Sequence, residues 1–218
     1  MSTFGGSTAS PDETGCGRCF DEDEVALLRT PHAPLPADLV RRVTQKDPHH
    51  WDDQPAIIRR TLPQLVTLLA DGERESALMA RGLAAAGWSH WPREQAEAVS
   101  HFLKTWWIET LRRNSPPIPA CEVLATCAIA SSSVTPWLTL WQAETGPVAH
   151  RHMCDTLDLW SEELTSEYSP FTWWWGPEAE EQAAWNEVKR WLTSPRSTTT
   201  LPLQSQAQPV SSPSASDK

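Results

Sequence analysis

Two cysteines near the amino terminus, Cys16 and Cys19, have the spacing of half a tetrahedral metal site. In a Cys-x2-Cys turn that contains a glycine, the two thiolates and the backbone amides can face one zinc ion. A structural zinc site needs two further ligands, and the sequence has no second Cys-x2-Cys. The turn therefore predicts half of a zinc site. If no metal binds there, it is a small turn with two partly buried thiols.

The stretch 150–154, His-Arg-His-Met-Cys, offers candidates for the missing ligands. On a helix that begins at Pro147, His150 and Cys154 lie four residues apart, on the same face as two apolar side chains. We therefore expect both side chains to face inward. The predicted zinc ligands are Cys16, Cys19, His150 and Cys154. Alternatives for the last two positions are His32, the pair His49 and His50, and His152.

Tryptophan is unusually frequent: the chain has 13 tryptophans beside one tyrosine and four phenylalanines. Three of them, Trp173, Trp174 and Trp175, are consecutive in a connection bounded by proline and glycine. Neighbouring side chains on such a segment diverge, so all three cannot enter one core. We expect at least one to be exposed and to bind a protein partner, because exposed tryptophan is effective in interfaces. The alternative is a hydrophobic plug that closes one end of the helical stack.

Other chemistries find less support in the sequence. Cys121 and Cys127 lie in a helix of small residues, with no motif that supplies a catalytic base. No glycine-rich phosphate-binding loop is present. The formal net charge of -10, from 18 basic and 28 acidic residues, argues against nucleic-acid binding. No signal-like or membrane-spanning apolar segment is present, so we expect a cytoplasmic protein with reduced thiols.

The elements that must position these residues are helices, because the apolar period is helical and no alternating run is sustained. The clearest segment is 54–71, with apolar residues at Ile58, Leu62, Leu65, Val66 and Leu69. Prolines that favour helix starts precede four others, at 36, 92, 136 and 147. Further helices fit 22–29, 73–86, 119–130 and 177–192. The sequence predicts an all-α fold of about nine helices, either an orthogonal bundle or a short α-solenoid-like stack.

The two ends differ in composition from the helical part. Residues 1–14 and 194–218 are rich in Ser and Thr, with Gly and Asp at the first end and Pro and Gln at the second. Such segments bury too little apolar surface to offset chain entropy, so both are predicted to be disordered. The expected organisation is a single helical domain over residues 15–193 between these two ends.

Three motifs resemble a group of proteins. They are Cys-Gly-Arg-Cys-Phe before an acidic helix, His-Trp-Asp-Asp before an Ile/Leu helix, and Thr-Pro-Trp-Leu-Thr-Leu-Trp. Together they look like uncharacterised helical proteins of high-GC actinobacteria, over roughly residues 15–165. The resemblance implies a bacterial cytoplasmic origin and brings no activity, cofactor or catalytic residue.

These observations favour a cytoplasmic protein–protein interaction or scaffold module that uses exposed tryptophans. One alternative is a zinc-binding regulatory helical protein. A further alternative is an enzyme with an unrecognised helical active site, for which the sequence indicates no catalytic residue.

Overall fold

The computed structural model describes residues 3–166 and 168–194. Within these residues it contains helices and no strand, so the all-α prediction is confirmed. The helices are α1 (Glu22–Arg29), α2 (Ala37–Gln45), α3 (Gln54–Ala70), α4 (Ser76–Ala85), α5 (Arg93–Arg112), α6 (Ala120–Ser131), α7 (Thr135–Ala143), α8 (Pro147–Leu159), α9 (Ser161–Thr165) and α10 (Glu178–Leu192), with two 3-10 helices, η1 (Pro48–His50) and η2 (Trp88–His90).

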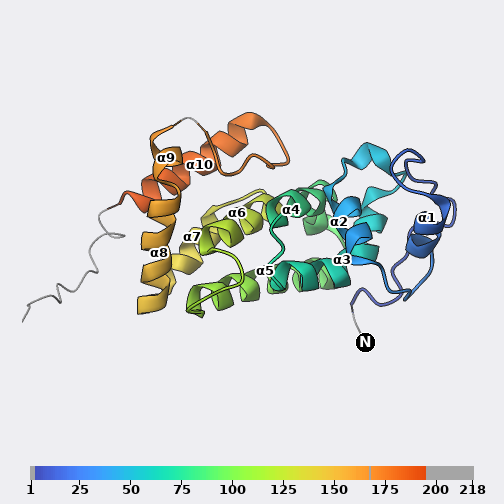
Figure 1. Ribbon diagram of the computed structural model, residues 1–218, viewed down its shortest axis with the longest axis horizontal. Coiled ribbons are helices and arrows are strands. Elements are labelled where there is room, and N and C mark those ends of the chain that lie inside the picture. Colours follow the sequence, from blue (N-terminus) through green and yellow to red (C-terminus); the bar gives the residue numbers. More distant parts are fainter. Residues whose placement is uncertain (1–2, 167, 195–218) are drawn as a thin grey trace, which may run out of the picture.

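The expected helix that begins at Pro147 is divided into α8 and α9, because the backbone at Trp160 leaves the helical region (φ -100°, ψ 16°). Figure 1 shows the helices following the long axis in approximate chain order, from α1–α3 at one end to α8–α10 at the other. This arrangement is closer to a stack of helices than to an orthogonal bundle. No described helix has the length and apolar character needed to span a membrane.

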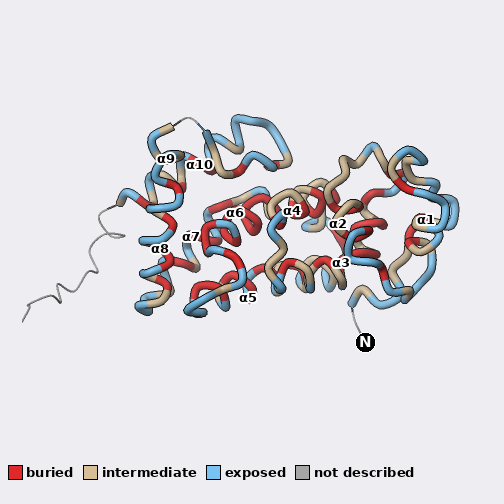
Figure 2. Tube along the Cα trace, viewed as in Figure 1, coloured by how far each residue is buried: buried red, intermediate tan, exposed pale blue. Residues whose placement is uncertain are grey.

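The core runs through the facing sides of the helices (Figure 2). Helix α6 is buried almost throughout, and its small side chains let α4 pack against it, with Ser76 Oγ and Thr126 Oγ1 2.8 Å apart. The contact of α4 with α2 is closer still. A Cβ atom on Gly82 would lie 2.0 Å from the carbonyl oxygen of Thr44, so only glycine fits this position.

The amino-terminal segment is docked on the helices. The Ala9 N–H donates to the Leu28 carbonyl at 3.0 Å, and Phe4 meets Trp91 edge-on with ring centroids 6.2 Å apart. Ala9 and Glu13 are buried. Residues of the segment 3–14 are thus in contact with the helices, although its composition predicts disorder. The tail predicted to be disordered is 194–218, of which residues 195–218 lie outside the described residues, as do residues 1–2.

Candidate metal centre

The first part of the site is a tight turn directly before α1. The N–H groups of Cys19 and Phe20 both donate to the Cys16 carbonyl, at 2.8 and 3.0 Å. Asp21 then caps α1 and forms a capping box with Glu24, which fixes where the turn ends. Both cysteine side chains are half-buried and free of disulfide. The turn therefore presents two thiols side by side, as the spacing predicts.

The third member is His50, the last residue of η1. Cys16 Sγ, Cys19 Sγ and a ring nitrogen of His50 all lie within 4.8 Å of one another. The distance from Cys19 Sγ to His50 Nδ1 is 3.6 Å. Tetrahedral bonds of about 2.3 Å to sulfur and about 2.0–2.1 Å to nitrogen place the two ligand atoms about 3.5–3.6 Å apart. The spacing thus fits a zinc ion between them.

A buried carboxylate joins the two segments that carry these ligands. Glu13 is fully buried, and its carboxylate accepts N–H groups of Gly15 at 2.9 Å, Asp52 at 3.1 Å and Asp53 at 3.0 Å. These bonds hold the chain before Cys16 against the chain after His50. The sequence pattern gave no sign of this role, because every donor to the Glu13 carboxylate is a backbone amide.

Aromatic packing supports the same junction. Phe20, which follows the turn, packs on Trp51, which follows His50, with ring centroids 4.4 Å apart. Gly15 has a φ of +61°, and a Cβ there would lie 2.9 Å from the Trp51 ring. A side chain at this position would strain the backbone and displace the indole, so glycine is required.

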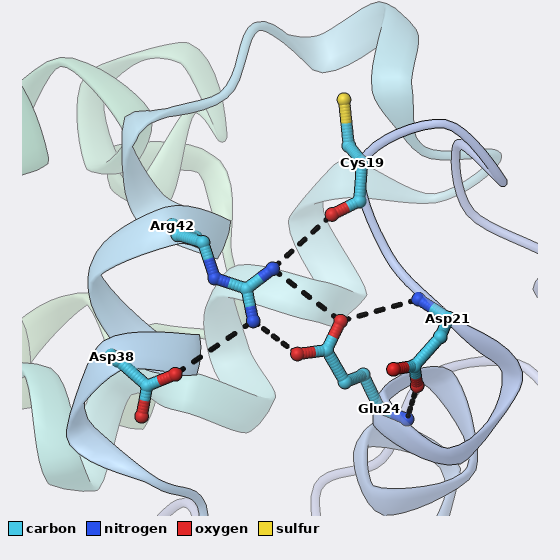
Figure 3. Close-up of polar contacts among 5 residues, drawn as sticks. All are labelled: Cys19, Asp21, Glu24, Asp38 and Arg42. Carbon is cyan, nitrogen blue, oxygen red and sulfur yellow. Dashed lines mark hydrogen bonds and ion pairs between the residues drawn. The ribbon is translucent and has the colours of Figure 1, made fainter.

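Arg42 fixes the turn from the side of α2, as Figure 3 shows. Its guanidinium donates to the Cys19 carbonyl at 3.2 Å and forms an ion pair with Glu24. The hydrogen bond from Arg42 lowers the pKa of Glu24, so this carboxylate stays charged. In Figure 3 the Cys19 carbonyl faces Arg42 while the sulfur points away from it, which leaves the sulfur available to His50.

The protonation states suit metal binding. The pKa of Cys16 is lowered, first by hydrogen bonding to the Arg18 backbone and then by the Cys19 side chain, with a smaller effect of Lys46. The pKa of His50 is lowered mainly by desolvation, and also by His49 and Lys46. Metal ligands must be thiolate and neutral imidazole, so both shifts favour the binding forms.

The structure does not bring His150 and Cys154 to this site. They lie on α8, at the other end of the molecule from α1 (Figure 1). Their side chains are 3.9 Å apart, but Cys154 is exposed, so the expectation that both face inward is wrong. The buried face of α8 instead carries Ala149, His152 and Thr156.

The other histidines considered as ligands are not members of the cluster. The Nε2–H of His152 donates to the Arg113 carbonyl at 2.9 Å. His32 is exposed and has a positive φ of 59°. The ring of His49 lies on that of His50, with centroids 4.3 Å apart, but His49 is not a member of the three-residue cluster.

The three consecutive tryptophans diverge as expected. Trp173 is 43% exposed, which confirms that at least one lies at the surface. Trp174 is buried against Phe171, with ring centroids 6.0 Å apart. Trp175 is half-buried, and the guanidinium carbon of Arg81 lies 5.0 Å from its ring centroid.

The remaining cysteines are core residues. Cys121 and Cys127 are buried in α6, and desolvation raises the pKa of Cys121 to about 11 and that of Cys127 further. Thiols of this kind are poor nucleophiles at neutral pH. The chemistry of the described chain is thus concentrated at Cys16, Cys19 and His50.

Comparisons with protein-family models, with curated proteins and with solved structures give no match for this chain.

Proposed function

We propose that this chain is a zinc-binding helical protein, with Cys16, Cys19 and His50 as ligands. The observation that carries the proposal is the mutual approach of the three ligand atoms within 4.8 Å. Thiolate and imidazole are the donors that suit Zn²⁺ and disfavour Mg²⁺ and Ca²⁺, which prefer oxygen.

Zinc at this position has a defined structural effect. It joins the turn before α1 to the 3-10 helix before α3, two segments that Glu13 already holds together by hydrogen bonds. Because a preformed site is absent from an unfolded chain, the binding free energy adds to the free energy of unfolding. The proposed role is therefore a metal clamp on the amino-terminal end of the stack.

The test is the metal content of the full chain purified without chelator. We expect about one zinc per chain in the wild type and its loss in the Cys16→Ser, Cys19→Ser double variant. His50→Ala should weaken zinc binding strongly. Cys154→Ser is the matched control, because this exposed thiol lies on α8, and it should keep full zinc.

Two results would contradict this proposal. One is wild-type protein that neither contains nor binds zinc and whose melting temperature does not respond to added zinc. The other is zinc that is retained in the double variant but lost in Cys154→Ser, which would place the ligands on α8.

The exposure of Trp173 favours a second role, binding of a protein partner. Tyr168, in the same connection, is 80% exposed, so two large aromatic rings of this segment face solvent. An interface tryptophan contributes about 2 kcal/mol or more on truncation, or about thirtyfold in affinity. Trp173→Ala should weaken association with a captured partner by this factor and leave the melting temperature nearly unchanged. Trp185→Ala, at a fully buried ring, is the control for lost stability.

If Trp173→Ala instead lowers the melting temperature sharply and the partner binds normally, the ring is structural. The plug alternative would then replace the interface.

A further inference from the structure

The cluster leaves one coordination position to be filled. Zinc sites are almost always tetrahedral, and three-ligand sites keep the fourth position for water or substrate. In residues 3–166 and 168–194, no fourth His, Cys, Asp or Glu has a ligand atom within 4.8 Å of the other three. The described part of the chain therefore supplies three ligands only.

This position is accessible from solvent. The three ligand residues are only half-buried, and the two residues between the cysteines, Gly17 and Arg18, are exposed. Structural zinc sites, by contrast, are closed by their own four side chains. The cluster is therefore not sealed from small molecules in solution.

The charges around the site select the ligand. Two thiolates, one neutral imidazole and Zn²⁺ sum to zero, so the centre itself neither attracts nor repels an ion. Lys46 directly follows α2 and lies four residues before His50 in the chain, and its charge lowers the pKa of both Cys16 and His50. Asp47, the acid beside it, forms an ion pair with Arg81. Lys46 has no ion-pair partner among the described residues.

We propose that the fourth position binds a small exogenous anion, and that Lys46 provides the selectivity for negative charge. This rests on the proposed zinc site. The ligand class is a monodentate anionic donor, of which a thiolate is the type best matched to zinc. The clamp is then also a binding site whose occupancy depends on the surrounding solution.

The experiment uses the full chain loaded with Co²⁺, and azide as the anionic probe. Thiolate-to-cobalt charge-transfer absorption reports that the metal is bound by the cysteines. The visible ligand-field bands report a change at the fourth position. We expect azide to change these bands saturably, and its affinity to fall with added inert salt because charge attraction is screened. Neutral imidazole should bind more weakly and without the salt dependence.

Lys46→Met keeps most of the side chain and removes the charge. An exposed charge pair contributes little, so azide affinity should fall about two- to fivefold. Lys104→Met, at an exposed lysine in the middle of α5, is the matched control and should leave azide affinity unchanged.

The outcomes separate the two proposals. Absence of the charge-transfer band means that the cysteines bind no metal, and the proposed function fails. A normal charge-transfer band with ligand-field bands that ignore azide means that the fourth position is closed, and only this inference fails. Equal azide affinity in Lys46→Met and wild type, or tighter binding of imidazole than of azide, would also overturn it.

Discussion

Removal of the Glu13 carboxylate should destabilise the junction of the site more than any exposed acid does. Glu13→Ala leaves the N–H groups of Gly15, Asp52 and Asp53 without their acceptor. A buried donor left without a partner costs about 1–3 kcal/mol, and partial access of water to these amides puts the value at the lower end. We therefore expect a loss of about 3–4 kcal/mol, a large fraction of the roughly 5–15 kcal/mol that stabilises a typical domain.

The assay is urea unfolding followed by tryptophan fluorescence, in chelator so that metal binding does not contribute. Glu109→Ala, at an exposed position of α5, is the control and should change the unfolding free energy by less than about 0.5 kcal/mol. Cobalt titration of folded Glu13→Ala should also show weaker binding, because the two ligand segments are no longer held together. A loss below about 1 kcal/mol, or unchanged cobalt affinity, would refute the assigned role of Glu13.

Three further outcomes follow from the packing and the protonation states. Gly82→Ala should destabilise the protein by about 2 kcal/mol or more, because the new Cβ would lie 2.0 Å from the Thr44 carbonyl oxygen. Gly146→Ala is the control and should cost less than about 1 kcal/mol, because no atom lies within 4 Å of its Cβ. Urea unfolding measures both changes. Iodoacetamide should label Cys154 in the zinc-loaded protein, and Cys16 and Cys19 only after the metal is removed with chelator. Cys121 and Cys127 should be labelled only when the protein unfolds. Zinc affinity should fall as pH falls, because protons compete with the metal for the ligands. Since the pKa values of Cys16 and His50 are lowered in the folded chain, it should bind zinc at a lower pH than the urea-unfolded chain does. Zinc titrations at several pH values measure this difference.

The helix boundaries could be predicted because their signals are local. The side chains of Asp21 and Asp53 accept backbone N–H groups at the starts of α1 and α3. Aspartate is favoured directly before the first turn of a helix for this reason, so its position in the sequence marks the helix start. Prolines mark the starts of α7 and α8 in the same way. The Cys16–Cys19 turn belongs to this class, because its geometry depends on four consecutive residues.

The remainder of the site could not be singled out from the sequence because its contacts are long-range or polar. His50 was one of several alternative ligands, because it reaches Cys19 across 31 residues and no spacing rule connects the two. On α8, the buried face holds His152 and Thr156, whose polar atoms bond to nearby carbonyls. An apolar pattern therefore pointed to the wrong face and selected Cys154.

The absence of a side chain at Gly82 has a mechanical consequence. Helices with side chains between them can adjust by rotamer changes, but α2 and α4 meet through backbone atoms at this point. Helix α2 carries Arg42, which holds the Cys19 carbonyl, and α4 carries Arg81, which lies over Trp175 and pairs with Asp47. A shift of the metal turn that displaces α2 would thus move α4 with it, and Arg81 would carry the movement to Trp175 in the aromatic connection before α10.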